Sequence, residues 1–293
     1  MAAAFKLTRQ NNVASGPMRH PRNLEQGAEN SIHNDEVAGK LGMRGGTVAG
    51  NYHMEQFPPL LTAVLGQRWW QSGNLSLYYK YATTDSEGVQ AFAQQPSMRT
   101  RRSCRFRCGW IMSRANAWPK ARAAVGAPDP QSALRRRIAA TPPPKDIRIL
   151  ADLKVGQSAT AKPFQVTPKR YQTRMDVIVE PMTDYTQASS WGAPILPPSL
   201  MVDVMYNAQF SLLQRDAKYG VGLFGGIELQ IYEGPMFPSR DYDARIKVLA
   251  IGETPQTEYF WYESISSDPK TGRDVAGMLM MLRFMKASSP LWK

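Results

Sequence analysis

The chain has 293 residues, of which 43% are hydrophobic and seven are tryptophan, so it can build one large domain or two of ordinary size. No apolar run approaches the roughly 18 residues that a membrane span needs, and the N-terminus lacks the apolar core of a secretory signal. With only two cysteines as well, the composition excludes a disulfide framework and predicts a cytoplasmic protein.

A polar cluster and a glycine-rich turn follow the first 28 residues, which are broken by proline and glycine. Asn30 is a candidate N-cap for a short helix, with His33 in its first turn and Asp35 near the positive end of the helix dipole. Gly45 and Gly46 then open a turn that ends at residue 50. Glycines here indicate either a backbone contact with a bound group or tight packing alone.

A long helical pattern follows the turn. Its apolar residues recur at spacings of three and four, at Met54, Phe57, Leu60, Leu61, Val64 and Leu65. Pro58 and Pro59 predict a bent or late start, and Gly66 or Gly73 ends the helix. His53 lies on this helix, where a packed or surface position is the simpler interpretation.

Strand patterns fill the rest of the first half. Residues 74–94 alternate apolar and polar side chains around a turn at 84–88, which predicts a hairpin or one bent strand. Residues 98–122 carry eight basic side chains and no acidic one, and residues 104–112 also alternate. A strand with one buried face and its arginines in solvent explains this stretch, so the net charge of +12 does not indicate a nucleic-acid partner.

The two cysteines, Cys104 and Cys108, fall on one face of that predicted strand. At ~3.3 Å per residue they lie about 13 Å apart. A disulfide requires Cα atoms within about 7 Å of each other, so the pattern predicts two half-buried free thiols. No histidine or further cysteine follows in the chain, and the pair therefore does not indicate a zinc site.

A proline-rich linker over residues 127–146 precedes a second unit. This unit has a predicted short helix at 168–175, a turn at Gly192 and a helix at 199–213. Turn residues separate four predicted strands, at 226–232, 242–251, 258–265 and 276–285. The last of these is nearly all apolar, which is typical of a central strand buried on both faces.

The order of one helix followed by antiparallel strands thus occurs twice. Superposing Gly45 on Gly192 places Met54 on Met201 and keeps the following strands in step. The second copy contains no histidine, so we expect the chemistry in the first. Two helices, each packed on one face of a curved antiparallel sheet, predict an α+β fold with units at 1–126 and 147–293.

This arrangement resembles the MaoC-like hot-dog hydratases and dehydratases, in particular members with two hot dogs in one chain. Their motif is Asp-x-Asn-Pro-x-His, and residues 28–33 read Ala-Glu-Asn-Ser-Ile-His. Asn30 and His33 match the motif, whereas Ala28 stands in the place of the aspartate. The resemblance implies a double hot dog, in which two long central helices are each wrapped by an antiparallel sheet and the sheets join into one.

The resemblance also implies the roles of the site residues. His33 and Asn30 are the catalytic residues of the motif, and Glu29 or Asp35 supplies the missing carboxylate. Gly50 polarises the thioester carbonyl through its backbone N–H at the start of the central helix, where the helix dipole favours negative charge. The substrate-binding residues are Gly45, Gly46 and Val48. The alternative for His33 is a structural role with a local hydrogen bond.

The implied activity is hydration of 2-enoyl thioesters, or dehydration of 3-hydroxyacyl thioesters, of CoA or an acyl carrier in fatty acid metabolism, without cofactor or metal. The second half, which has Asp184 before its turn but no histidine, is expected to shape the acyl tunnel. We expect a homodimer of double hot-dog chains, with no membrane or nucleic-acid partner. The alternatives are a catalytically weak acyl-CoA-binding protein, which Ala28 favours, and a thioesterase.

Overall fold

The computed structural model describes residues 5–94, 104–112, 120–213 and 217–293. The strands of the first half are β1 (Thr8–Gln10), β2 (Val13–Arg19), β3 (Gly73–Tyr78), β4 (Val89–Gln94), β5 (Cys104–Met112) and β6 (Lys120–Val125). Those of the second half are β7 (Ser158–Gln165), β8 (Gly222–Ile231), β9 (Asp241–Glu253), β10 (Thr257–Ser267) and β11 (Asp274–Met285).

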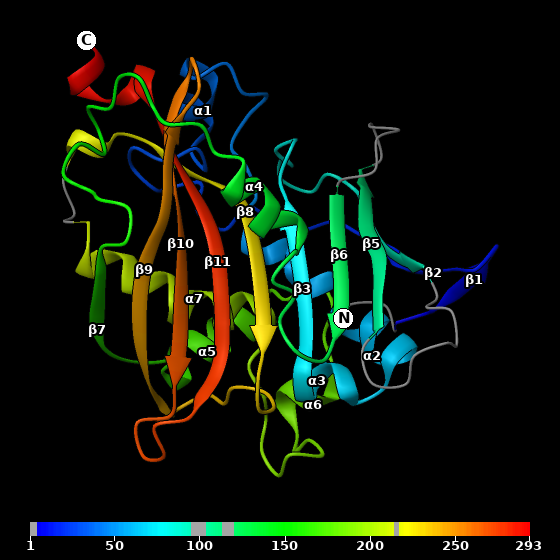
Figure 1. The fold of residues 1–293 in the computed structure, drawn as a ribbon. Helices are drawn as coiled ribbons and strands as arrows, with labels where there is room; N and C mark the ends of the chain where they lie inside the picture. The colour runs from blue at the N-terminus through cyan, green and yellow to red at the C-terminus, as the bar shows by residue number, and fades with distance from the viewer. Residues whose placement is uncertain (1–4, 95–103, 113–119, 214–216) are drawn as a thin grey trace.

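These strands form one antiparallel sheet in the order β1-β2-β4-β5-β6-β3-β8-β11-β10-β9-β7 (Figure 1). The two halves meet where β3 pairs with β8, with Leu75 opposite Leu229 and Leu77 opposite Ile227. Each half would otherwise present an unpaired strand edge at this point, and joining the edges removes both. The predicted continuous sheet is therefore confirmed.

The helices that shape the core lie on one face of the sheet. In the first half they are the 3-10 helix η1 (Gly50–Gln56) and the helices α2 (Pro58–Leu65) and α3 (Arg68–Ser72). In the second half they are α5 (Pro168–Met175), α6 (Thr183–Thr186), α7 (Pro198–Tyr206) and the 3-10 helix η2 (Asn207–Ser211). The short α1 (Asp35–Lys40) lies beside the upper end of the sheet in Figure 1.

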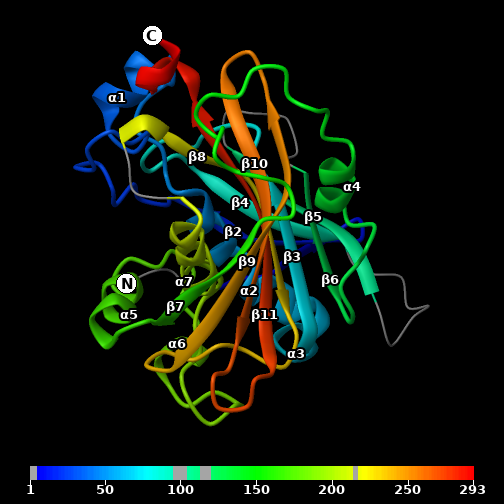
Figure 2. The same ribbon diagram turned by 60° about the vertical axis from the view of Figure 1, so that its left-hand side comes forward.

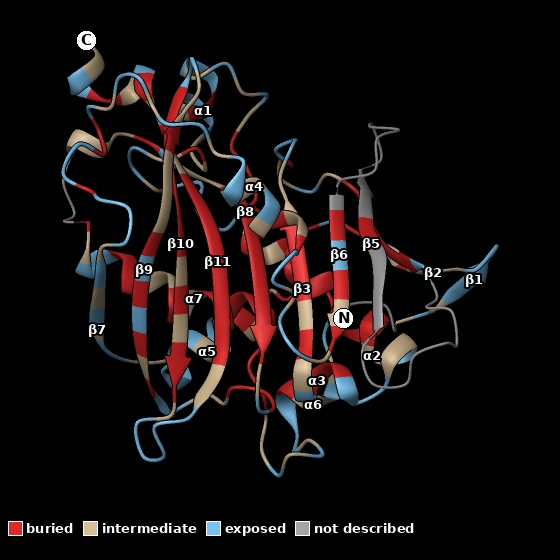
Figure 3. Cartoon of the chain, viewed as in Figure 1, coloured by how far each residue is buried: buried red, intermediate tan, exposed pale blue. Residues whose placement is uncertain are grey.

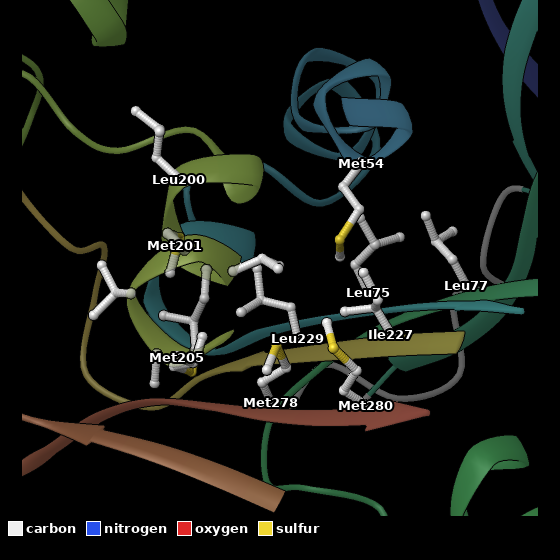
Figure 4. Close-up of a cluster of buried hydrophobic side chains, with 14 of the residues drawn as sticks. Met54, Leu75, Leu77, Leu200, Met201, Met205, Ile227, Leu229, Met278 and Met280 are labelled. Atoms are coloured by element: carbon white, nitrogen blue, oxygen red, sulfur yellow. The ribbon is translucent and has the colours of Figure 1, made fainter. Parts of the chain in front are cut away.

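Side chains of the strands alternate between two faces. Met278 and Met280 of β11 point toward Met201 and Met205 of α7, and Met54 of η1 packs near them (Figure 4). The central strands are buried along most of their length (Figure 3), as predicted for the last strand. Burial of this apolar surface, at roughly 25 cal/mol per Å², is the main favourable contribution to folding.

The opposite face of the sheet is covered by a segment that the sequence predicted to be a linker. It contains the helix α4 (Ala133–Ala139), which lies on the other side of the sheet from α7 (Figure 2). Leu134 of α4 is buried against Tyr259, Trp261 and Met281, the outward-facing residues of β10 and β11. The prolines that follow do not prevent this helix because they lie beyond its end.

Several predicted elements differ from the observed ones. β3 and β4 were expected to form a hairpin or one bent strand, but they are separate strands with β5 and β6 between them. The first central helix consists of η1, α2 and α3, with the bend at Pro58 and the end of α2 at Gly66 that the sequence predicted. The second ends as an α-helix at Tyr206 and continues as a 3-10 turn.

The predicted basic strand is present as β5, which pairs with β4 and β6. Cys108 is buried, with 3% of its surface exposed, rather than half-buried. Residues 98–103 and 113–119, which the basic stretch includes, lie outside the described residues. Across the described ranges, no helix is both long enough and apolar enough to cross a bilayer.

Candidate functional site

A cavity of about 810 Å³ lies between the two halves of the chain. Its first-half wall consists of the loop around His33, the segment that leads into η1 and the residues that follow β3. Its second-half wall consists of residues of α5, α7 and η2 and of the facing ends of β8 and β11. Of the predicted site residues, Asn30, His33, Val48 and Gly50 line this cavity.

His33 is held in one orientation by the strand-like segment beside it. Its Nδ1 lies 2.5 Å from the carbonyl oxygen of Thr47, and the amide of Thr47 donates to the carbonyl oxygen of Ile32 at 2.9 Å. A carbonyl oxygen can only accept, so Nδ1 carries the proton and donates. In the neutral ring, Nε2 is then the free base, which is the arrangement a proton-transferring histidine requires.

The helix start near His33 differs from the prediction. Asn34, not Asn30, is the N-cap of α1, and its Oδ1 accepts from the amides of Glu36 at 3.0 Å and Val37 at 3.1 Å. His33 therefore precedes the helix instead of lying in its first turn. Asn30 is exposed, with a positive φ of 51°, and belongs to the turn that carries the histidine.

The two carboxylates expected to replace the missing aspartate lie outside the lining of the cavity. Asp35 uses its Oδ1 to accept from the amide of Gly46 at 2.7 Å, which ties α1 to the glycine turn. Glu29 is exposed to solvent. The hydrogen bond to Gly46 turns Asp35 toward the glycine turn, and neither carboxylate belongs to the described cavity lining.

The glycine turn has a packing role at Gly46. A Cβ there would lie 2.3 Å from the carbonyl oxygen of His33, so only glycine allows the two segments to approach. Gly45 and Gly46 support the histidine loop rather than line the cavity. Val48, in contrast, is buried in the wall and donates its amide to the carbonyl oxygen of Thr83 at 2.8 Å.

Gly50 is the first residue of η1, where backbone amides have no partner within the helix. Its carbonyl oxygen accepts from the hydroxyl of Tyr79 at 2.7 Å. A Cβ at Gly50 would lie 3.0 Å from the Tyr79 ring and 3.4 Å from Phe224. The start of η1 therefore lies in the cavity wall in a crowded place.

His53 lies in the cavity wall but is held inside the protein, as the packing interpretation predicted. It is 3% exposed, and its Nδ1 lies 3.2 Å from Nε2 of Gln56. Burial lowers the pKa of His53 to about 4, so the ring is neutral at physiological pH. It contributes shape and polarity rather than a titrating charge.

A polar group from the second half was not anticipated from the sequence. Asp203 of α7 lines the cavity, and its Oδ2 accepts from Arg170 at 2.6 Å. Its Oδ1 accepts from Nδ2 of Asn51 at 3.3 Å. Glu25, the other carboxylate among the described lining residues, is exposed and lies 3.4 Å from the hydroxyl of Tyr52.

The rest of the second-half wall has a largely aromatic apolar part beside the polar side chains of Asn207, Gln209 and Arg283. It includes Tyr206, Phe210, Leu213, Phe224, Leu282 and Phe284. The Tyr206 ring lies edge-on to Phe224, with 5.2 Å between centroids. Aromatic rings in this arrangement form a firm apolar surface. Their spacing along two strands and one helix carries no signal in the sequence, because core packing produces the same pattern.

The fold is shared with solved structures that cover nearly the whole chain. A putative MaoC domain dehydratase from Chloroflexus aurantiacus has a TM-score of 0.62 and 8% identity, over 97% of this chain and 95% of that one. A conserved hypothetical protein from Mycobacterium tuberculosis with a double hot-dog fold has a TM-score of 0.61 and 8% identity, over 97% and 96%. A MaoC-like dehydratase has a TM-score of 0.54 and 11% identity, over 94% and 98%.

These likenesses show that the chain has the double hot-dog fold, an α+β architecture, which confirms the predicted fold. No protein-family model matches the sequence, and no curated protein matches it either. The roles of individual residues therefore rest on the geometry of the cavity.

Proposed function

We propose that this protein is a hydratase or dehydratase that interconverts 2-enoyl and 3-hydroxyacyl thioesters of CoA. One observation carries the proposal: His33, with its Nδ1 fixed by a carbonyl oxygen, and the helix start at Gly50 line the same cavity. A base beside a set of backbone amides is the arrangement that addition of water to a conjugated thioester requires. The neighbours named as dehydratases support this assignment by fold alone.

In the proposed reaction, Nε2 of His33 exchanges a proton with the water that is added or lost. The amide of Gly50 stabilises the negative charge that develops on the thioester oxygen, because a fixed donor in a partly buried site costs no reorganisation. Asn30 and Val48 contact the substrate from the same loop system. Gly45 and Gly46 act indirectly by holding the histidine loop in place.

We further propose that the acyl chain occupies the apolar wall of the second half. Tyr206, Phe224 and Phe284 lie in this wall, which has no histidine. On this basis residues 147–293 form a hot-dog unit that shapes the substrate space, residues 1–126 carry His33 and the amide of Gly50, and residues 127–146 connect them. Light scattering on the purified protein tests the accompanying expectation of a homodimer.

The test of the function is an assay on a panel of 2-enoyl-CoAs of increasing chain length. Hydration removes the conjugated double bond, so the absorbance of the enoyl thioester falls, and mass spectrometry then detects a product heavier by one water. Loss of absorbance with that product is the expected result. A panel with no turnover would contradict the proposal.

The second candidate is a binding protein of low activity or a thioesterase, and Ala28 in place of the motif aspartate favours it. The two activities leave different products. A thioesterase releases free CoA, which a thiol reagent detects, whereas a hydratase leaves the thioester intact. A binding protein protects against thermal unfolding in the presence of enoyl-CoA without changing it.

A further inference from the structure

The two central helices carry carboxylates at matching positions. The caps are Ala49 for η1 and Pro197 for α7, and Glu55 and Asp203 are each the sixth residue after the cap. The match extends to their partners. Asn51, two residues after the first cap, donates to Asp203 at 3.3 Å, and Ser199, two residues after the second cap, donates to Glu55. The helices are thus linked by a reciprocal pair of hydrogen bonds.

Each of the two carboxylates also lies beside an arginine side chain. Both arginines belong to α5: Arg170 donates to Asp203 at 2.6 Å, and Nε of Arg174 lies 3.2 Å from Glu55. Each carboxylate is therefore held from two sides, by a side chain of the opposite central helix and by a guanidinium. Both carboxylates are fixed in position, which is what a reacting group requires and what a surface carboxylate lacks.

The two carboxylates differ in what they face. Glu55 has no exposed surface, and its charge acts on the hydroxyl of Tyr185 in the segment before α7. Asp203 lines the cavity, with 19% of its side chain exposed. Each helix therefore directs its carboxylate toward the other half, and only the carboxylate of α7 reaches the cavity that contains His33.

A short stretch of backbone connects Asp203 with the histidine. His33 is bonded to the carbonyl oxygen of Thr47, and Asp203 is bonded to the side chain of Asn51, the residue next to Gly50. Every residue from 47 to 51 lines the cavity. The imidazole, the start of η1 and the carboxylate thus all belong to the wall of one cavity.

We propose that Asp203 is the catalytic carboxylate of this site, supplied by the second half in place of the aspartate that is missing at Ala28. This inference rests on the proposed hydratase function. Of the other candidates, Glu29 and Asp35 do not line the cavity, and Glu25 is exposed with a single long contact to Tyr52. Asp203 combines access to the cavity with a fixed orientation.

The proton balance of the reaction closes with these two groups. As the oxygen of water bonds to C3 of the enoyl thioester, Nε2 of His33 takes one proton from the water. The electrons of the double bond move to C2 and the thioester oxygen, and protonated Asp203 delivers its proton to C2. His33 then returns its proton to Asp203 through the bound product or water, so that one H and one OH have been added and no other reactant is consumed. Burial raises the pKa of Asp203, while the charge and the hydrogen bond of Arg170 oppose that rise.

The test is Asp203→Asn, which keeps the size of the side chain and its acceptor oxygen. We expect kcat for enoyl-CoA hydration to fall about 100-fold, the scale for loss of a general acid, with KM changed less than about threefold. Asp203→Ala should lose as much and regain activity when formate is added, because formate fits the vacated carboxylate position. Asp176→Asn, an exposed residue of the adjoining loop, is the matched control and should keep wild-type turnover.

The outcomes separate the inference from the proposed function. An active wild type with an equally active Asp203→Asn variant would overturn the role of Asp203 and leave the hydratase function standing. An active wild type that is silenced by Glu25→Gln instead would assign the carboxylate to Glu25. Loss of activity without formate rescue, together with a lowered melting temperature, would make Asp203 structural. An inactive wild type would overturn the proposed function and the catalytic role together.

Discussion

The starts of the two central helices have the same backbone frame and different chemistry. In the first half, the amides of Thr47 and Val48 donate to carbonyl oxygens on either side of the segment. In the second half, the amides of Ile195 and Leu196 make the corresponding bonds. The frame is therefore a requirement of the fold, because both halves need it to hold a helix against the sheet.

The two halves differ in the side chains that bond to this backbone frame and in the first residue of each helix. The carbonyl oxygen of Thr47 accepts from an imidazole, whereas that of Ile195 accepts from the hydroxyl of Tyr171 at 3.0 Å. The first helix begins with Gly50, and the second begins with Pro198, which has no amide hydrogen. The comparison teaches that the first half has an imidazole and a glycine where the second half has a phenol and a proline.

A buried ion pair tests whether polar groups of the second half serve stability rather than turnover. Glu180, in the segment before its central helix, is buried and accepts from Arg19 of β2 at 2.6 and 2.8 Å. Glu180→Gln removes the negative charge from this buried ion pair, which costs about 3–5 kcal/mol of unfolding free energy. Urea unfolding measures this loss. Asp152→Asn breaks an exposed pair with Lys218 and should cost less than about 1 kcal/mol, and equal losses would contradict the structural role of Glu180.

Replacing Gly50 with proline removes the amide hydrogen and gives η1 the same first residue as α7, which begins at Pro198. Gly50→Pro is compatible with a first helical position, and Ala49 before it already has an extended ψ of 133°. We expect kcat to fall about 10²–10³-fold relative to Gly50→Ala, the usual cost of one oxyanion donor. Gly50→Ala is the control, because it introduces the same Cβ near Tyr79 and keeps the N–H. Equal turnover of the two variants would show that the amide does not act on the thioester.

His33 and Tyr171 can be compared directly, since each donates to the matching carbonyl oxygen. His33→Ala should lower kcat about 100-fold because the only base at this position is lost. Tyr171→Phe removes a hydroxyl that bonds two carbonyl oxygens, so it should lower the melting temperature and leave kcat within about twofold. Steady-state kinetics and calorimetry on both variants test this division. A His33→Ala variant with wild-type turnover would make the histidine structural.

The sequence predicted the parts of the fold that depend on local pattern. The apolar alternation of β11 and the spacing in η1 and α2 depend on neighbours along the chain, so they could be recognised. The order of the strands could not, because β3 pairs with β8 and not with β4. β2 was missed because its residues, which include Gly16 and Pro17, have weak strand propensity and are held by pairing with β4.

For the site as well, the sequence predicted only the features that depend on local pattern. Motif order pointed to His33 and Gly50, which the structure has in the cavity wall, and Val48 lies between them in the same segment. Asp35 was misjudged because its direction depends on the cap at Asn34, one residue away. Asp203 gave no signal, since a carboxylate among apolar residues of a helix is ordinarily its solvent face. Asp203 reaches the cavity wall because two helices from different halves pack against each other.

A pH-dependent effect on stability is expected at Glu55, the buried counterpart of Asp203. Burial raises the pKa of Glu55 to about 7, although Arg174 and the Ser199 hydroxyl oppose the shift. The folded protein therefore binds a proton at Glu55 between about pH 4.5 and pH 7, where the unfolded chain does not. This contribution to stability is complete below about pH 4.5 and is lost as pH rises through about 7.

We therefore expect the unfolding free energy to decline over that interval, by about 1.4 kcal/mol for each pKa unit of the shift. Glu55→Gln mimics the protonated acid and should flatten this part of the profile. Asp203→Asn serves as the comparison: its carboxylate is in contact with the cavity, so it should change turnover far more than the pH dependence of stability. Urea unfolding at several pH values measures the slopes. An unchanged slope in Glu55→Gln would show that Glu55 is ionised in the folded protein and that Arg174 outweighs burial.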